Sequence, residues 1–305
     1  MEAVRMNRMH GICVPMITPM MDDGSVDYHS LENLTDHLIS RGVDALYPCG
    51  TTGEVNNLSF EERKKITGVV VKTSAGRVPV FAQIGGRITS ETVELARLAV
   101  DAGSDGLGLL SPTYYHLTDE ELLGYYKTVA DAVPDTSIYI YGIPFCTGNV
   151  LSTALVERIA SECPNILGIK YSVGDILQLS EFSRIRNGNF DVLVAPIQML
   201  LPSLAIGVVG TVSGNNHIYI EAIAKLIHTF EAGDIKSCRE QQTRLAVLSG
   251  KLAFKEIAKC KALLARAGVI SSEAIRLPQL QVSSSEKQEL FKFIDEYYPE
   301  YSFRL

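Results

Sequence analysis

The 305-residue sequence predicts an α/β fold, a single (β/α)8 TIM barrel with a C-terminal helical appendage. Short apolar runs, typical of buried strands, alternate with segments whose apolar residues recur at helical spacing. The alternation continues to about residue 232 and contains eight units, and eight parallel strands favour a closed barrel over an open sheet. Three more helical patterns follow it. We expect residues 1–232 to form the barrel and residues 233–305 to pack on it, as one structural domain.

The expected strands are apolar and end at turn residues; they are 11–17, 45–48, 78–84, 106–110, 137–141, 166–171, 191–195 and 208–212. The helices expected after them are 31–41, 59–74, 91–102, 118–132, 152–162, 176–185, 199–206 and 218–232. Two of these begin with a capping box, Ser59 with Glu62 and Thr118 with Glu121. The appendage helices are expected at 235–252, 254–267 and 285–297.

Composition excludes several classes of protein. The net charge is −7 and no block of lysine or arginine stands out, which argues against a nucleic-acid partner. The sequence contains no run of 18 apolar residues, so no membrane span is expected. The first ten residues lack the apolar core of a signal peptide. Six cysteines without a CxxC pair favour reduced thiols, so we expect a cytoplasmic protein.

Lys170 stands at the far end of the apolar run 166–171. Lysine is almost never fully buried without a partner, and barrel enzymes carry their chemistry at the carboxyl ends of the strands. Strand alternation predicts that Lys170 and Gly168 point into the barrel, and that Leu167 and Ile169 face the helices.

The preceding strand supplies a second inward group at the same end. Ile138 and Ile140 share the face suited to the helices, so Tyr141 is expected to point into the mouth of the barrel. Adjacent strands lie about 4.8 Å apart, and Tyr141 can therefore meet Lys170. An amine in a desolvated pocket becomes a nucleophile toward carbonyl carbon, and a nearby phenol can pass protons. A core tyrosine and a lysine that reaches solvent remain the alternative.

The second strand is followed by Gly50-Thr51-Thr52-Gly53. Glycines around two hydroxyls let backbone N–H groups turn toward an anion, either a carboxylate or a phosphate, although the same residues also make a plain turn. Gly207 and Gly210 precede the eighth strand, where many barrels bind phosphate, but no lysine or arginine accompanies them. The cysteines and His116 show no metal-ligand spacing, so no metal is expected.

Four motifs together resemble the dihydrodipicolinate synthase / N-acetylneuraminate lyase superfamily, and the similarity extends from about Gly11 to Ala267. The motifs occur in the order Gly50-Thr51-Thr52-Gly53-Glu54, Ser111-Pro112-Thr113-Tyr114-Tyr115, Tyr141-Gly142-Ile143-Pro144 with Thr147-Gly148, and Gly168-Ile169-Lys170. The resemblance implies a class I, Schiff-base, pyruvate-dependent aldolase or lyase that needs no metal or other cofactor.

The resemblance also implies roles for individual residues. Lys170 would form the imine with the keto carbon of pyruvate or another 2-oxo acid, and Tyr141 would shuttle protons. Thr51 would relay protons between Tyr141 and solvent. Thr52, with the backbone amides of the turn that begins at Gly50, would hold the pyruvate carboxylate.

Two further positions depend on the same resemblance. Tyr114 matches the tyrosine that members insert into a neighbouring subunit's site, and Val212 matches a position that contacts pyruvate. A homotetramer made of two tight dimers is therefore expected.

The residues expected to select the second substrate match neither namesake. Members that make the dihydrodipicolinate precursor carry an arginine in the Tyr-x-x-Pro loop, where this chain has Cys146, and a thiol cannot replace a bidentate carboxylate clamp. Sialic-acid lyases carry an Asp-Glu pair after the seventh strand, where this chain has Gln198 and Met199.

The sequence therefore predicts a pyruvate-dependent aldolase or lyase acting on a 2-oxo acid. A 2-keto-3-deoxy-sugar-acid dehydratase, which uses the same imine but eliminates water, is the closest alternative. Dihydrodipicolinate synthase or N-acetylneuraminate lyase proper stays open, as does a non-catalytic barrel that acts as a sensor or a structural oligomer.

Overall fold

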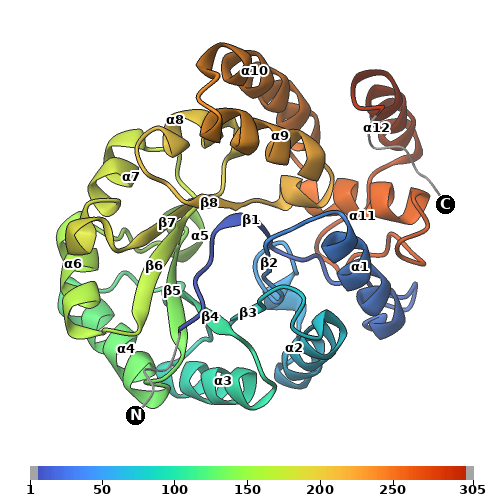
Figure 1. The fold of residues 1–305 in the computed structure, drawn as a ribbon. Helices are drawn as coiled ribbons and strands as arrows, with labels where there is room; N and C mark the ends of the chain where they lie inside the picture. Colours follow the sequence, from blue (N-terminus) through green and yellow to red (C-terminus); the bar gives the residue numbers. More distant parts are fainter. Residues whose placement is uncertain (1–5, 300–305) are drawn as a thin grey trace.

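The computed structural model describes residues 6–299 and confirms the barrel (Figure 1). Eight parallel strands pair in the order β2-β1-β8-β7-β6-β5-β4-β3, and an isolated parallel bridge between Leu46 and Val80 joins the two ends of this sheet. The strands are β1 (Gly11–Val14), β2 (Ala45–Leu46), β3 (Phe81–Gln83), β4 (Gly106–Leu110), β5 (Ser137–Gly142), β6 (Ile166–Tyr171), β7 (Asp191–Val194) and β8 (Gly210–Val212).

Helices connect the strands and surround them (Figure 1). They are α1 (Tyr28–Ser40), α2 (Phe60–Ser74), α3 (Thr89–Asp101), α4 (Asp119–Ala132), α6 (Thr153–Glu162), α7 (Ile176–Phe182), α8 (Leu200–Leu204) and α9 (Ile220–Glu231). Both predicted capping boxes are confirmed, at the starts of α2 and α4. No helix in the part of the chain that the structure describes is long and apolar enough to cross a membrane.

Short helical turns that the sequence did not predict follow several strands and, in one case, the helix α7. They are the 3-10 turns η1 (Val55–Asn57), η2 (Ile185–Gly188), η3 (Ile197–Met199) and η4 (Gly214–His217), and the one-turn helix α5 (Pro144–Thr147). Three or four residues hold too few apolar positions to show a helical period, so a search for apolar periodicity does not detect such turns.

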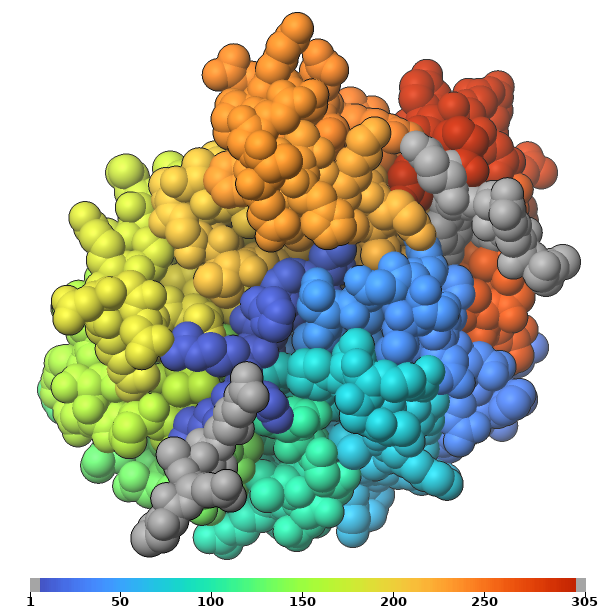
Figure 2. All heavy atoms as spheres, in the orientation of Figure 1, coloured from blue at the N-terminus to red at the C-terminus, as the bar shows by residue number. Residues whose placement is uncertain are grey.

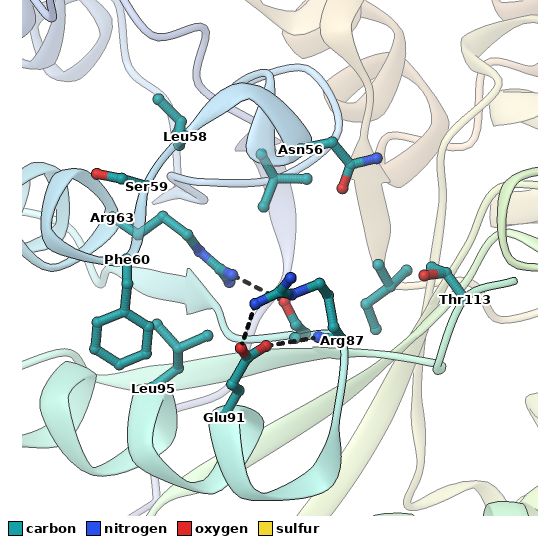
Figure 3. Close-up of a pocket in the computed structure, with 13 residues that line it drawn as sticks. Asn56, Leu58, Ser59, Phe60, Arg63, Arg87, Glu91, Leu95 and Thr113 are labelled. Atoms are coloured by element: carbon teal, nitrogen blue, oxygen red, sulfur yellow. Dashed lines mark hydrogen bonds and ion pairs between the residues drawn. The ribbon is translucent and has the colours of Figure 1, made fainter.

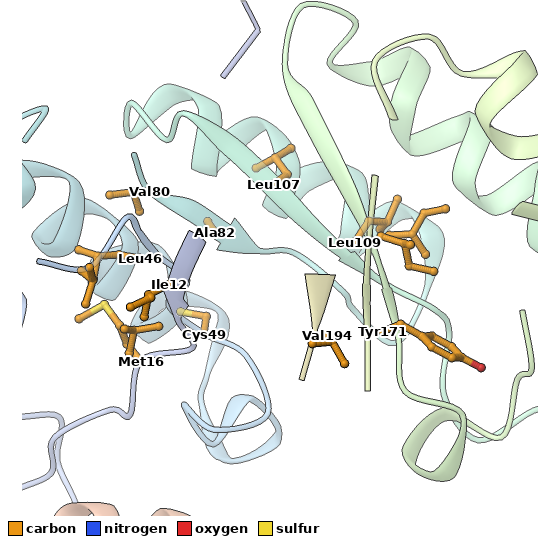
Figure 4. Close-up of a cluster of buried hydrophobic side chains, with 14 of the residues drawn as sticks. Ile12, Met16, Leu46, Cys49, Val80, Ala82, Leu107, Leu109, Tyr171 and Val194 are labelled. Atoms are coloured by element: carbon orange, nitrogen blue, oxygen red, sulfur yellow. The ribbon is translucent and has the colours of Figure 1, made fainter. Parts of the chain in front are cut away.

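Strand alternation divides the apolar residues into an outer and an inner set. Ile138 and Ile140 belong to the large cluster between the sheet and the helices, part of which Figure 4 shows. Tyr139 belongs to the cluster inside the barrel, together with Cys13, Ala45, Tyr47, Phe81, Leu193 and Val212. The inward direction predicted for the Tyr139 and Tyr141 face of β5 is therefore confirmed.

The prediction that Leu167 faces the helices is wrong. Ile138 pairs with Ile166, but Tyr139 pairs with Gly168, so that β6 carries one extra residue at this point. Such a bulge breaks the two-residue alternation, and Leu167 consequently packs in the cluster inside the barrel. Alternation resumes after the bulge, which leaves Ile169 outside and pairs Tyr141 with Lys170.

The N-terminal residues close the barrel at the end where the strands begin. Met9 is fully buried, and its backbone N–H donates to the Tyr139 hydroxyl at 2.8 Å. Arg8 forms an ion pair with Asp191, the first residue of β7, at 2.7 Å. Figure 2 shows this stretch in dark blue across the middle of the molecule. Within the described residues, Arg8 and Met9 therefore cover this end of the barrel.

The C-terminal appendage consists of α10 (Ile235–Leu252), α11 (Glu256–Arg266) and α12 (Ser284–Tyr297), and α10 lies against α9 outside the ring (Figure 1). A buried ion pair joins α11 to the loop after β2, because Lys261 Nζ lies 2.5 Å from Glu54 Oε1 and both side chains have no exposed surface. Lys261 also donates to the carbonyl oxygen of Ala274, and the Arg276 backbone N–H donates to Glu54 Oε2. Burial lowers the pKa of Lys261, and the neighbouring charge of Glu54 and its hydrogen bond oppose this shift.

Replacing one member of this pair should destabilise the fold strongly. We expect Lys261→Ala to lower the free energy of unfolding by about 3–5 kcal/mol, because it leaves a buried carboxylate unpaired. Denaturant titration at neutral pH measures this change. Lys292→Ala is the matched control, since its pair with Glu296 is exposed and should be worth less than about 1 kcal/mol. Equal losses in the two variants would contradict the prediction.

Candidate active site

A cavity of about 370 Å³ opens where the strands finish. Seven of the nine residues that the sequence singled out line it, and they come from five strands or the loops that follow them. These residues are Thr51, Thr52, Tyr141, Cys146, Lys170, Gln198 and Val212. The other two, Gly50 and Tyr114, do not line the cavity.

Lys170 lies among aromatic rings at the bottom of this cavity. It is 3% exposed, and its Nζ lies 3.7 Å from the ring centroid of Tyr141 and 4.7 Å from that of Tyr47. Aromatic faces attract a cation electrostatically, whereas a carboxylate would also accept hydrogen bonds from the ammonium group. Lys170 forms no hydrogen bond or ion pair with any residue between 6 and 299, which leaves its nitrogen available to a ligand.

The Tyr141 hydroxyl connects this buried centre to the surface. It lies 3.1 Å from the Thr51 hydroxyl, and either oxygen can be the donor. Tyr141 is 3% exposed, whereas Thr51 is exposed. The two hydroxyls therefore form a short path along which a proton can move between the side of Lys170 and solvent.

The turn after β2 presents backbone donors at the cavity. Cys49 has a φ of 61°, and the Gly53 and Glu54 amides bond to the carbonyl oxygens of Gly50 and Thr51. Within residues 6–299, the backbone amides of Thr51 and Thr52 have no hydrogen-bond acceptor. Because both residues line the cavity, these amides are suited to a carboxylate. Gly50 contributes to the turn and not to the cavity wall.

Tyr114 projects from the surface of its own subunit. It is 87% exposed, its ring packs edge-on against Tyr115 at 5.1 Å between centroids, and its φ is 79°. Positive φ is uncommon in a tyrosine and persists where the surroundings enforce it, often at functional sites. The Tyr114 side chain therefore lies at the surface and outside the cavity of its own chain.

Sequence reasoning missed Tyr47, the residue directly after β2, whose ring lies beside Lys170. Its ring meets that of Tyr141 edge-on at 6.1 Å and is fully buried. The ring crosses the barrel to Gly108, where a Cβ would lie 1.9 Å from the Tyr47 hydroxyl. The signal was present in the sequence, because alternation along β2 places Ala45 and Tyr47 on the inner face.

Glu256 was also missed, and the sequence carried no signal for it. It begins α11 in the appendage, lines the cavity, and accepts a hydrogen bond from Asn215 Nδ2 at 2.6 Å. Burial raises the pKa of Glu256, and the nearby charge of Lys170 opposes this shift. An acidic side chain from outside the barrel therefore lies in the electrostatic field of the lysine.

A second hollow of about 350 Å³ lies between η1 and the starts of α2 and α3 (Figure 3). Arg63, which donates to the carbonyl oxygens of Gly85 and Gln83, lines it together with the ion pair of Arg87 and Glu91. None of the nine candidate residues lines this hollow. No group of three or more metal-ligating side chains occurs among residues 6–299.

Comparison with known proteins identifies relatives along nearly the whole chain. The model of the Dihydrodipicolinate synthetase family matches residues 8–297. The 4-hydroxy-tetrahydrodipicolinate synthase of Geobacter sulfurreducens is 34% identical over 94% of this chain and 98% of the relative. That of Aquifex aeolicus is 35% identical over 94% of this chain and 97% of the relative.

Solved structures agree with this similarity. The crystal structure of dihydrodipicolinate synthase from Aquifex aeolicus has a TM-score of 0.90 at 33% identity, covering 95% of this chain and 98% of that one. A prophage protein of the dihydrodipicolinic acid synthase family from E. coli K12, in complex with pyruvate, has a TM-score of 0.90 at 27% identity, covering 95% and 99%.

The two inward tyrosines Tyr47 and Tyr139 should respond oppositely to loss of their hydroxyls. The buried Tyr47 hydroxyl has no hydrogen-bond partner, so we expect Tyr47→Phe to leave the free energy of unfolding unchanged or raise it by up to about 1 kcal/mol. The Tyr139 hydroxyl donates to Asp191 at 2.6 Å, so Tyr139→Phe should lose about 1–3 kcal/mol. Denaturant titration of both variants tests this, and a comparable loss in Tyr47→Phe would refute it.

Proposed function

Because the chain belongs to the Dihydrodipicolinate synthetase family, and is a lyase of the Schiff-base, pyruvate-dependent aldolase class, we propose that Lys170 is the nucleophile that forms the imine. The observation that carries the assignment is the position of Lys170. It is a buried lysine at the carboxyl end of a barrel strand, it faces two aromatic rings and it has no acidic partner in contact.

The reaction proceeds in balanced steps. The Lys170 amine attacks the keto carbon of pyruvate, and the carbinolamine loses water to give a protonated imine. Loss of a proton from the methyl carbon gives an enamine, because the imine nitrogen accepts the electron pair. The enamine carbon then bonds to an aldehyde carbon, whose oxygen takes a proton, and water hydrolyses the imine to release product and amine. Cleavage follows the same steps in reverse.

The neighbouring groups serve proton transfer and substrate binding. Tyr141 delivers and removes protons at the carbinolamine, and Thr51 links it to solvent through the 3.1 Å contact of the hydroxyls. Thr52 and the unpaired amides of the turn hold the pyruvate carboxylate, while Val212 packs beside the methyl group.

The second substrate differs from that of the named relatives. Cys146 lines the cavity, and no arginine between residues 6 and 299 does. Gln198 lines it too, while Met199 ends η3. We therefore infer an aldehyde other than aspartate semialdehyde, and turnover of that compound should be very slow. A 2-keto-3-deoxy-sugar-acid dehydratase remains the second candidate, since the same imine supports loss of water.

We also propose a cytoplasmic homotetramer in which Tyr114 enters the site of a neighbouring subunit. Its exposure, its enforced backbone conformation and its absence from the cavity of its own chain support this arrangement. All six cysteines are free, as expected in a reducing compartment.

Borohydride trapping tests the imine directly. Incubation with pyruvate and borohydride should add the mass of one reduced pyruvate per chain, and Lys170→Arg should abolish the gain. The exposed lysine variant Lys225→Ala should keep it. A mass gain that survives in Lys170→Arg, or none in the unmodified protein, would exclude the Schiff base.

Complementation between subunits tests the role of Tyr114. Lys170→Ala and Tyr114→Ala should each lower aldol activity by at least about 100-fold, which is the lower range for a lost proton-transfer group. After mixing, unfolding and refolding together, hybrids combine an intact Lys170 with a partner's intact Tyr114, so part of the activity should return. A monomer by sedimentation, or no recovery in verified hybrids, would contradict the shared site.

A further inference from the structure

The active-site cavity is lined by few ionisable side chains. Among the described residues that line it, Lys170 is the only basic side chain and Glu256 is the only acidic one. When Lys170 carries pyruvate as a protonated imine, the pyruvate carboxylate balances that charge. Glu256 then leaves the remainder of the cavity negative, which disfavours a second substrate that carries a carboxylate.

Glu256 is held in a defined position. Asn215 Nδ2 donates to its Oε1 at 2.6 Å and to the Ser213 hydroxyl at 3.3 Å, which fixes the orientation of the Asn215 amide. Gly214 gives the carboxyl group its space, since a Cβ there would lie 2.7 Å from Glu256 Cδ. A carboxylate seated in this way is pre-organised for a ligand.

Two acceptor atoms in this corner have no donor. No described residue donates a hydrogen bond to Glu256 Oε2. The Oδ1 of Asn215, a residue only 6% exposed, is buried and unpaired. Buried acceptors without donors are costly, and they are satisfied when a ligand brings donors. The surrounding polar residues Ser172, Gln198, Ser213 and Ser249 are neutral, as in a site for hydroxyl groups.

We propose that Glu256, positioned by Asn215 and Gly214, selects an uncharged, hydroxyl-bearing aldehyde as the second substrate by accepting hydrogen bonds from its hydroxyl groups. The inference rests on the function proposed for Lys170, and it adds the chemical class of the acceptor. The α10–α11 junction, outside the barrel, thereby determines specificity.

Matched aldehydes separate this inference from the imine chemistry. Glyceraldehyde and propionaldehyde have the same carbon chain and differ in two hydroxyls, and succinic semialdehyde supplies an anionic alternative. We expect kcat/KM for addition to the pyruvate enamine to favour glyceraldehyde over both. Glu256→Gln should reduce the ratio of glyceraldehyde to propionaldehyde by about 10- to 100-fold, as expected for a lost hydrogen bond to a charged acceptor.

The same variant should narrow the discrimination against succinic semialdehyde, because the negative charge is gone. Glu289→Gln is the control, an exposed glutamate of α12 distant from the cavity lining, and it should keep both ratios. Borohydride trapping with pyruvate shows whether each variant retains a folded imine site.

The outcomes distinguish the two proposals. If Glu256→Gln traps pyruvate but keeps the wild-type ratios, Glu256 does not select the aldehyde and this inference is overturned alone. If Glu256→Gln no longer traps pyruvate although the unmodified protein does, Glu256 acts in imine formation and the inference is likewise overturned. If the unmodified protein traps no pyruvate, the proposed function fails and this inference fails with it.

Discussion

The buried ion pair between Glu54 and Lys261 connects the two parts of the molecule that build the active site. Glu54 closes the turn whose Thr51 and Thr52 line the cavity, and Lys261 belongs to α11, whose first residue is Glu256. A charge with no exposed surface is tolerated only beside a close partner of opposite charge. Movement of α11 away from the barrel would separate the two charges and leave a buried charge unpaired. The appendage is therefore a fixed wall of the cavity.

The second constraint is the register of two neighbouring strands. A bulge at Leu167 shifts β6 by one residue, and Tyr141 pairs with Lys170 only because of this shift. The pairing places the lysine nitrogen 3.7 Å from the centroid of the Tyr141 ring, and the ring of Tyr47, the residue after β2, lies 4.7 Å from the same nitrogen. Strand ends thus hold the reactive groups rigidly, whereas the loops after them and the start of α11 line the rest of the cavity.

Keeping the imine chemistry while changing the second substrate requires changes only in those loops and at the start of α11. Cys146 and Gln198, which the resemblance matches to charged groups of the namesake enzymes, line the cavity, and Glu256 is the only acidic side chain of this lining within the described residues. Once the pyruvate carboxylate balances the protonated imine of Lys170, the carboxylate of Glu256 selects the aldehyde. In this arrangement a single glutamate opposes anionic aldehydes and attracts hydroxyl groups.

The sequence by itself determined the eight strand–helix units, both capping boxes and the inward position of Lys170, because these depend on local periodicity and on chemistry between near neighbours. Strand alternation also places Tyr47 on the inner face of the barrel, although it was not predicted as a site residue. Only the tertiary structure decided that Leu167 turns inward, that Tyr114 lies away from the cavity of its own chain, and that Glu256 lines the same cavity as Lys170. Each of these depends on contacts between residues distant in sequence, and such contacts produce no periodic pattern of apolar residues from which they could be predicted.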